Sequence, residues 1–238
     1  MDAVQIFVCE RDARFRVDGV ATDAGPGQLI VSCGKSRVEA LDEACLGLRV
    51  YDADFKVLYP ELADLLDPDT PAVFVPEPLR RIGAEAEVLR VVARLADANR
   101  EAMLRFVFVF CLGHDRRYFS SLLRQRAIGD PHFFEFIARH SLNPWSVTRY
   151  AEELGLSLRK FNELFQEKYG ISAKHWLLEH RLQHARGLLL MTRQRVVDIA
   201  LECGFSNHAH FADSFKRRFG VSPSAWRQNG RVGGGTLA

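Results

Sequence analysis

The sequence predicts an α+β chain, with a small antiparallel β half and accompanying helices followed by an all-α domain. In that domain two helix-turn-helix motifs are joined by a long helix. Three observations lead to this class: short β-type runs within residues 1–65, helix-forming stretches after them, and a repeated segment near the C-terminus. A chain of 238 residues, 47% of them hydrophobic, has room for two domains with separate cores.

The first 65 residues contain four runs that predict strands. These runs are "VQIFVCE", "RFRVDGV", "GQLIVSC" and "LGLRVYD", and turn residues such as those of "DAGPGQ" separate them. Antiparallel pairing into a small barrel is the expected result. About 65 residues leave little room in such a barrel for a sealed small-molecule cavity.

A proline-rich link is expected over 66–79, and helices over 80–128. The run "FVFVF" alternates like a strand, but it continues from the good helix formers "ANREAMLR", so we predict helix there. Val88, Leu89, Val92 and Leu95 form one apolar stripe. Such a stripe is usually intramolecular core, and the alternative is a dimer contact made by Val88, Val92 and Leu95.

Residues 131–229 contain an internal repeat that predicts two helix-turn-helix modules. Ala151, Glu153, Gly155 and Ser157 match Ala200, Glu202, Gly204 and Ser206 at an offset of 49. Phe161, Phe165, Gly170, Ser172 and Trp176 match Phe211, Phe215, Gly220, Ser222 and Trp226 at an offset of 50. One residue is therefore inserted in the second copy, and the period indicates a duplicated supersecondary unit.

Each module shows the expected local signals. The first helix of the second module is expected to end at Cys203, with a turn through Gly204 and Phe205. Ser157 and Ser206 are expected as N-caps, and Gly170 and Gly220 as left-handed helix ends. The linking helix of about 19 residues would be roughly 28 Å long. That length approaches the ~34 Å between successive major-groove faces of a duplex.

The modest net charge of +2 divides unevenly along the chain. Residues 131–238 hold 15 basic against 9 acidic side chains, a net +6, and residues 1–130 hold 17 against 21, a net −4. Seven of the eight histidines also lie in the second part. This division favours polyanion binding by the basic part and regulation or assembly by the acidic part.

The sequence gives no support for a secreted, membrane or metal-dependent protein. The five cysteines are scattered and lack a CxxC pair, so we expect reduced thiols that fill the core of a cytoplasmic protein. No run of about 18 apolar residues is long enough for a membrane span. His180 and His184 have zinc-compatible spacing but no evident third ligand, so we expect no metal and no cofactor.

The C-terminal motifs resemble the DNA-binding domain of the AraC/XylS family of bacterial transcription regulators. The resemblance rests on "RLQHARGLLL", "VVDIALECGFSNHAHFADSFKRRFGVSPSAWRQ" and "LFQEKYGISAKHWLLEHRL", and it covers about residues 131–229. It implies a bipartite domain of about seven helices, preceded by a regulatory or dimerisation domain at 1–130. Residues 230–238 are expected to form a flexible tail.

The resemblance also implies which residues contact DNA. Base-reading positions fall on Arg159, Asn162, Glu163, His208, Ala209, Ala212 and Asp213. Arginine suits guanine, asparagine suits adenine, alanine can meet a thymine methyl, and the acids either accept from cytosine or pair with local cations. Phosphate contacts are expected from Ser157, Lys160, Ser206, Asn207, Lys216, Arg217 and Arg227.

A second resemblance concerns the first half and the regulation of the chain. "GPGQLIV" is similar to a turn and strand of the cupin-like sensor half of many AraC relatives. The architecture also resembles the subgroup that activates type III secretion genes, which implies promoter DNA, RNA polymerase and a secretion chaperone or anti-activator as partners. The resemblance also leads to the hypothesis of a homodimer, whereas no membrane partner is expected.

The sequence leaves two alternative hypotheses open. The first is a small-molecule-responsive regulator of the same family. The second is a cupin-type enzyme, but the first histidine of the chain is His114, so the usual metal centre cannot form within residues 1–113. A fused alkyl-transfer repair enzyme would need a cysteine cluster that Cys9, Cys33 and Cys45 do not form. We therefore expect a transcription activator without catalysis of its own.

Overall fold

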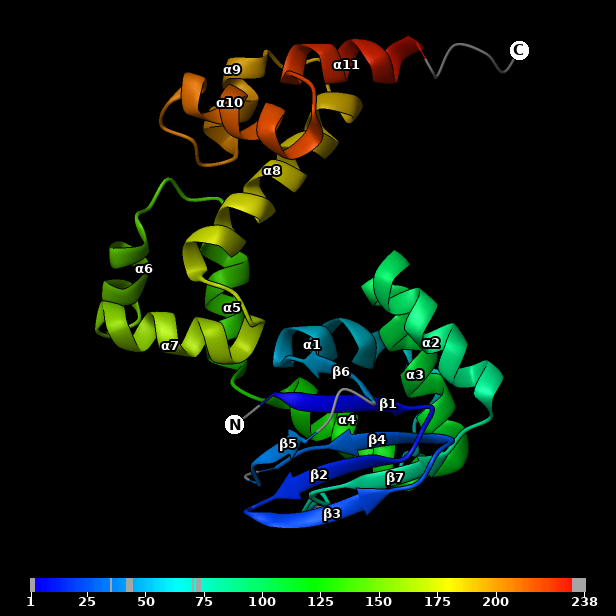
Figure 1. Cartoon of the computed structure of the whole chain (residues 1–238). Coiled ribbons are helices and arrows are strands. Elements are labelled where there is room, and N and C mark those ends of the chain that lie inside the picture. Colours follow the sequence, from blue (N-terminus) through cyan, green and yellow to red (C-terminus); the bar gives the residue numbers. More distant parts are fainter. Residues whose placement is uncertain (1–2, 35, 42–44, 70, 72–73, 233–238) are drawn as a thin grey trace. The chain divides into compact units, whose positions relative to one another are not determined.

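The structure, a computed structural model, describes residues 3–34, 36–41, 45–69, 71 and 74–232. The chain divides into two compact units. The first comprises residues 1–129 and 167–170, and the second comprises residues 130–166 and 171–238. The first unit contains antiparallel sheets with helices, and the second contains helices throughout its described part (Figure 1). The predicted α+β class is confirmed.

The strands of the first unit form two antiparallel sheets (Figure 1). The described strands are β1 (Val4–Cys9), β2 (Ala13–Val17), β3 (Val20–Ala24), β4 (Gln28–Ser32), β5 (Val38–Ala40), β6 (Cys45–Val50) and β7 (Arg80–Gly83). One sheet has the order β6-β1-β4-β7 and the other has the order β3-β2-β5. The four predicted runs correspond to β1, β2, β4 and β6, whereas β3, β5 and β7 were not predicted.

The central strands β1 and β4 are apolar on both faces because each face covers a different core. Ile6 and Val8 of β1 point toward the helices, whereas Phe7 and Cys9 point toward the second sheet. Between the sheets, the rings of Phe7 and Phe15 meet edge to face at 5.0 Å. Side chains thus occupy the interior around Phe7 and Phe15, and a pocket of about 280 Å³ lies beside Phe7, between β1, β5 and β6.

Helices of the first unit complete the larger core on the other face of the four-stranded sheet. They are α1 (Asp52–Glu61), the short 3₁₀ helix η1 (Ala63–Leu65), α2 (Ala86–Ala98), α3 (Arg100–His114) and α4 (Arg116–Ile128). The predicted β region of 1–65 is wrong after Val50, because α1 begins at Asp52. The predicted helical region 80–128 is likewise wrong at its start, where β7 pairs with β4. The helix predicted through "FVFVF" is confirmed in α3.

The apolar stripe of α2 is mainly intramolecular core. Leu89 and Val92 are 0% and 1% exposed, and Leu95 packs against the same cluster. Val92 is therefore out of reach of a second copy while α2 stays packed, whereas the half-buried Leu95 keeps its predicted dimer contact as a hypothesis. Val88 is only half-buried and lies one turn from the exposed Val91.

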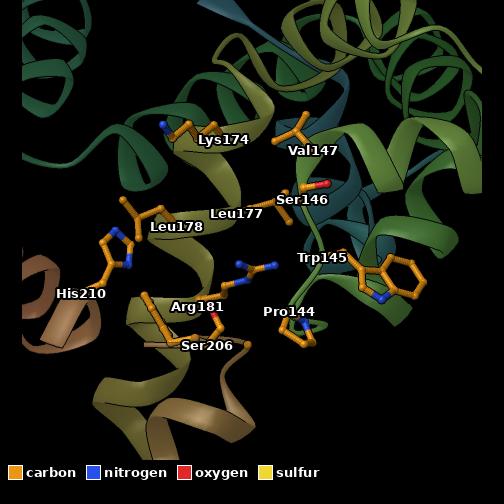
Figure 2. A pocket seen from close by; sticks show the side chains of 12 residues that line it. Pro144, Trp145, Ser146, Val147, Lys174, Leu177, Leu178, Arg181, Ser206 and His210 are labelled. Carbon is orange, nitrogen blue, oxygen red and sulfur yellow. The ribbon is translucent and has the colours of Figure 1, made fainter. Parts of the chain in front are cut away.

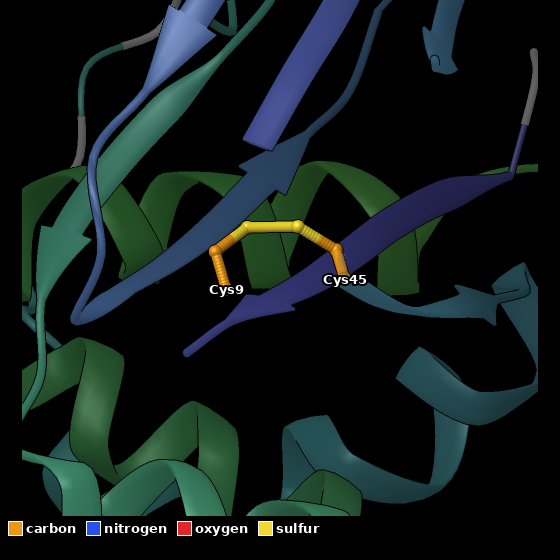
Figure 3. The surroundings of a disulfide bond; sticks show 2 residues. All are labelled: Cys9 and Cys45. Atoms are coloured by element: carbon orange, nitrogen blue, oxygen red, sulfur yellow. A yellow bond between two sulfur atoms is a disulfide. The ribbon is translucent and has the colours of Figure 1, made fainter. Parts of the chain in front are cut away.

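Two of the five cysteines form a disulfide, which corrects the expectation of five free thiols (Figure 3). Cys9 and Cys45 are register partners on β1 and β6, with Cα atoms 4.7 Å apart. Cys33, Cys111 and Cys203 are free and buried, as expected for core residues. The bond joins residues 36 positions apart in the sequence. It links the edge strand β6 to its neighbour β1.

The second unit contains α5 (Pro131–His140), α6 (Val147–Glu153), α7 (Leu158–Tyr169, whose last three residues group with the first unit), α8 (Ala173–Met191), α9 (Val196–Glu202), α10 (His208–Phe219) and α11 (Pro223–Val232). The first module is α6 and α7, the second is α9 and α10, and α8 links them over its predicted 19 residues. The predicted tail at 230–238 begins within α11, and residues 233–238 lie outside the described residues. No helix in the described part is long and apolar enough to cross a membrane.

Candidate nucleic-acid interface

Each module is built around a row of aromatic side chains on its second helix. In the first module, Phe161 and Phe165 of α7 are fully buried, and Phe165 contacts the Trp176 ring of α8 at 5.7 Å. In the second module, Phe211 and Phe215 of α10 are fully buried. This i, i+4 spacing turns the opposite face of each helix outward.

The turn of the first module leads directly into a capped α7. Gly155 has a positive φ of 66°, and the amide of Leu156 donates to the Ala151 carbonyl at 2.9 Å. The hydroxyl of Ser157 then accepts from the amide of Lys160 at 3.2 Å. The predicted N-cap role of Ser157 is confirmed, because its oxygen satisfies an amide that has no partner within the helix.

The turn of the second module is one residue longer. Gly204 has a φ of 78°, and the amide of Phe205 donates to the Ala200 carbonyl at 2.9 Å, as in the first copy. The cap, however, is Asn207, whose side-chain oxygen accepts from the amides of Ala209 and His210 at 2.8 and 3.2 Å. The predicted N-cap at Ser206 is therefore wrong, because the inserted residue lies between Phe205 and the cap.

The outward face of α7 carries long polar side chains. The Arg159 side chain is 90% exposed, and its Nε donates to a carboxylate oxygen of Glu163 at 2.8 Å. This hydrogen bond lowers the pKa of Glu163 and raises that of Arg159. Asn162 is exposed on the same face. Glu163 thus has the local cation partner that the sequence left as an alternative to base contact.

The outward face of α10 carries shorter side chains. His208, Ala209 and Asp213 are exposed, and Ala212 is half-buried. Both Arg159 and His208 therefore lie outside the cores, as a groove-reading role requires. Alanines bring the helix backbone close to any surface that α10 meets, whereas the α7 face can reach farther by hydrogen bonding.

The phosphate candidates differ in how accessible they are. Ser157, Lys160, Ser206, Asn207, Lys216 and Arg217 are exposed. Arg227 is half-buried and donates from Nε to the Leu189 carbonyl at 3.3 Å, so it also joins α11 to α8. Lys216 and Arg217 lie in the last turn of α10, where positive charge is favoured by the helix dipole.

Two arginines have structural roles that the sequence did not reveal. Arg218 donates to Glu179 of α8 at 2.7 Å, and this bond lowers the pKa of Glu179. Arg181 of α8 donates to the backbone carbonyls of Ser141 and Asn143 and to the hydroxyl of Tyr150. These partners lie about forty and thirty residues away, so no local spacing signals them.

The described residues contain no group of three or more His, Cys, Asp or Glu side chains that is able to hold a metal ion. The ring of His180 stacks on that of Trp176, with centroids 4.8 Å apart. His184 is exposed on the same helix. The "HRLQH" segment thus has a packing explanation for its first histidine.

Comparisons with known proteins identify the C-terminal region. A family model described as a helix-turn-helix domain matches residues 150–229. The chain is 43% identical over 93 residues to the HTH-type transcriptional regulator ExsA of Pseudomonas aeruginosa. It is 42% identical over 93 residues to the virulence regulon transcriptional activator VirF of Yersinia enterocolitica. Each of these two alignments covers 39% of this chain and 34% of the relative.

A solved AraC-type DNA-binding regulator from Chromobacterium violaceum is also similar, with 32% identity and a TM-score of 0.38 over 44% of this chain and 96% of that one. The match to the two curated relatives spans about a third of their length. These relatives are named as transcription regulators and not as enzymes. The two capped modules, the linking helix and the sequence matches agree over the same residues. Residues 150–229 thus form a helix-turn-helix domain that is similar to those of the transcription regulators ExsA and VirF.

Proposed function

We propose that the chain is a sequence-specific transcription activator whose α7 and α10 enter consecutive major grooves of promoter DNA. The observation that carries this proposal is the pair of capped helices, each with a buried aromatic row and an exposed opposite face. They are linked by α8, whose 19 residues span roughly 28 Å. This length suits two readers about one duplex turn apart.

The side chains support different roles for the two helices. Arg159 and Asn162 of α7 suit guanine and adenine, and Glu163 holds Arg159 until a base competes for it. His208, Ala209, Ala212 and Asp213 of α10 form a shorter surface that suits close approach. The exposed Lys216 and Arg217 add phosphate attraction without sequence preference.

The relatives support a regulatory role in virulence. One is named as a virulence regulon transcriptional activator, and ExsA is named as a transcriptional regulator. We propose that this chain controls type III secretion genes in the cytoplasm, with RNA polymerase as the downstream partner. A secretion chaperone or anti-activator is the proposed controlling partner. Side chains such as Phe7 and Phe15 occupy the interior of the β half, and the pocket beside Phe7, about 280 Å³, is smaller than the usual small-molecule site of roughly 300–1,000 Å³.

A homodimer is part of the same proposal, through the half-buried Val88 and Leu95 of α2 and the exposed Val91 on the same face. Sedimentation of the full chain at micromolar concentration tests it. A monomer under those conditions would reject the dimer and leave the DNA-binding proposal unaffected.

Genomic footprinting of the full chain tests the central proposal. The protected sequence should contain two half-sites one helical turn apart, read by one chain. Inserting five base pairs between the half-sites should abolish specific binding. Retention of full affinity for that duplex would show that the modules do not read consecutive grooves.

Salt dependence supplies an independent measurement. Lys216→Ala and Arg217→Ala should each reduce the slope of log affinity against log salt by about 0.9, and they should weaken all duplexes alike. Arg218→Ala is the matched control, because Arg218 already pairs with Glu179. An equal loss of slope in Arg218→Ala would remove the distinction between phosphate-binding and structural cations.

A further inference from the structure

A cleft lies between the two modules, within the second unit. It has a volume of about 490 Å³. Its walls are the segment 144–147, which leads into α6, one side of α8 from Lys174 to Arg181, and the turn 204–206 with His210 (Figure 2). We call it the inter-module cleft. Neither groove-reading face is needed to form it, so its lining residues are not explained by base recognition.

The lining of the inter-module cleft is apolar with a few cationic groups. Leu177 and Leu178 of the linking helix α8 and Phe205 of the second module's turn supply apolar side chains, and Trp145, just before α6, adds an aromatic ring. Such a mixture, in a volume of roughly 300–1,000 Å³, is typical of small-molecule sites. A phosphodiester strand would gain little from contact with the half-buried Leu178 and Trp145, whereas a ligand with a hydrocarbon body would gain from covering them.

The charged side chains of the cleft are both cationic. Lys174 and Arg181 line it together with the imidazole of His210, and none of its twelve lining residues, all of them described, carries a carboxylate. Arg181 is half-buried and already oriented, because its guanidinium donates to the Ser141 carbonyl at 3.0 Å and to the Tyr150 hydroxyl at 3.2 Å. Lys174 is exposed on the same helix and can move to meet a ligand. An anion is therefore favoured over a cation or a neutral molecule.

We propose that the inter-module cleft binds an amphipathic organic anion, namely a carboxylate on an aromatic or branched hydrocarbon body. The body lies against Leu177, Leu178 and Phe205, and the carboxylate faces the cationic groups. This inference does not depend on the proposed function, because it rests on the cleft alone.

A ligand in this position has a consequence for DNA binding. Segment 144–147 belongs to the first module's side, and residues 204–206 and His210 belong to the second, so one bound molecule contacts both. Ser206 is also a predicted phosphate contact. The ligand and the duplex are then coupled, and each changes the affinity of the other by the same factor.

Isothermal titration of the full chain with 2-naphthoate tests the proposal, with 2-naphthamide as the matched neutral compound. We expect saturable binding of the carboxylate at one site per chain and roughly tenfold weaker binding of the amide, a difference of about 1.4 kcal/mol. Equal affinity for the two compounds would overturn the assignment of an anion.

Variants of α8 locate the site. Leu178→Trp should fill the cleft and weaken naphthoate binding at least tenfold, whereas Leu190→Trp adds the same ring to an α8 position that is 49% exposed and outside the cleft. Lys174→Ala should weaken binding severalfold, and Lys160→Ala, an exposed lysine of the same unit, should not. Equal binding by the two tryptophan variants would overturn the proposal.

The alternative that the cleft contacts DNA phosphates predicts a different result. If naphthoate shows no binding up to millimolar concentration while Lys174→Ala lowers the salt slope of DNA binding, the cleft contacts phosphates and the proposal is wrong. If naphthoate binds but no footprint is found on DNA, the ligand site stands and the proposed function fails. The two failures are therefore distinguishable.

Discussion

Gly155 and Gly204 occupy the same position in the two modules, yet they have different neighbours. Both have a positive φ, 66° and 78°. A Cβ added to Gly155 would meet nothing within 4 Å, whereas one added to Gly204 would overlap the Leu142 carbonyl and lie 3.1 Å from the Asn143 oxygen. The turn of the second module thus packs against the backbone that precedes the first module, and the first module's own turn has no such neighbour.

This difference shows that the two modules are not structurally equivalent, although their sequences repeat. Both turns require glycine for the positive φ, but only Gly204 also needs the missing side chain, because its Cα lies against the backbone of residues 142–143. The same 142–143 segment is held by Arg181 of α8. The second module is therefore positioned through residues 142–143, which precede the first module, as well as through α8.

The largest expected effect comes from the aromatic cores. Phe165→Ala and Phe215→Ala should each destabilise the chain by about 3–5 kcal/mol, since both side chains are fully buried. Urea unfolding followed by tryptophan fluorescence measures this, because Trp176 and Trp226 lie beside the respective rings. A loss below about 1 kcal/mol in either variant would mean that its module is not built around that aromatic row.

Substitution of the two glycines should give the next largest loss of stability, and it tests the difference between the two turns directly. Gly155→Ala should cost about 1–2 kcal/mol from backbone strain alone. Gly204→Ala should cost roughly 2–4 kcal/mol, because overlap with the Leu142 carbonyl adds to that strain. Denaturation midpoints of the two variants provide the measurement. Equal losses would show that the contact between Gly204 and residues 142–143 does not stabilise the domain.

Loss of a base contact should change the free energy of DNA binding by an amount similar to or smaller than the stability losses of the glycine variants. Arg159→Ala should weaken binding to the cognate duplex by about 1–3 kcal/mol and relax the preference for one base. Arg195→Ala is the control, because Arg195 is also exposed and paired with a near neighbour, Asp198. Competition between cognate and single-base-substituted duplexes is the measurement. Unchanged discrimination by Arg159→Ala would contradict its assigned contact.

The caps give the smallest effect. Asn207→Ala and Ser157→Ala should each cost about 1 kcal/mol, because each removes the acceptor for amides in the first turn of its helix. Ser206→Ala should cost less than about 0.5 kcal/mol, since Ser206 is exposed and is not the cap. Thermal unfolding compares the three. A larger loss for Ser206 than for Asn207 would reverse the assignment of the cap.

The helices of the second unit were predictable because local chemistry determines them. Phenylalanines four residues apart, glycines at helix ends and the length of α8 all appear within short stretches. The cap was missed by one position, since Ser206 and Asn207 are both good caps and adjacent. Only the hydrogen bonds show where the insertion lies.

The β half was less predictable because its pairing is non-local. β7 starts directly after the link and pairs with β4, about fifty residues earlier, so its four residues carry little local signal. The Cys9–Cys45 disulfide depends on the same long-range register. Helix α1 follows β6 after one residue, and its interior Pro60 obscures the helical pattern.

The exposed residues of the candidate interface were predictable from the sequence, but the side-chain contacts around them were not. Helical spacing is sufficient to place Arg159 and His208 outside the cores, and the structure shows both as exposed. Spacing does not reveal that Arg181 binds Ser141 and Asn143, or that Lys174 and His210 line one cleft. Those groups come from elements far apart in the chain, so only the folded arrangement joins them.

The uninterrupted α8 sets the angular phase between its two ends. Adding one residue in its middle would rotate everything beyond that point by about 100° while advancing it only about 1.5 Å. A duplex tolerates the small advance far more readily than the rotation, which would turn one of the two helices away from its groove. Changes in the length of α8 are therefore expected to be tolerated only near whole helical turns, and even then with a different distance between the half-sites.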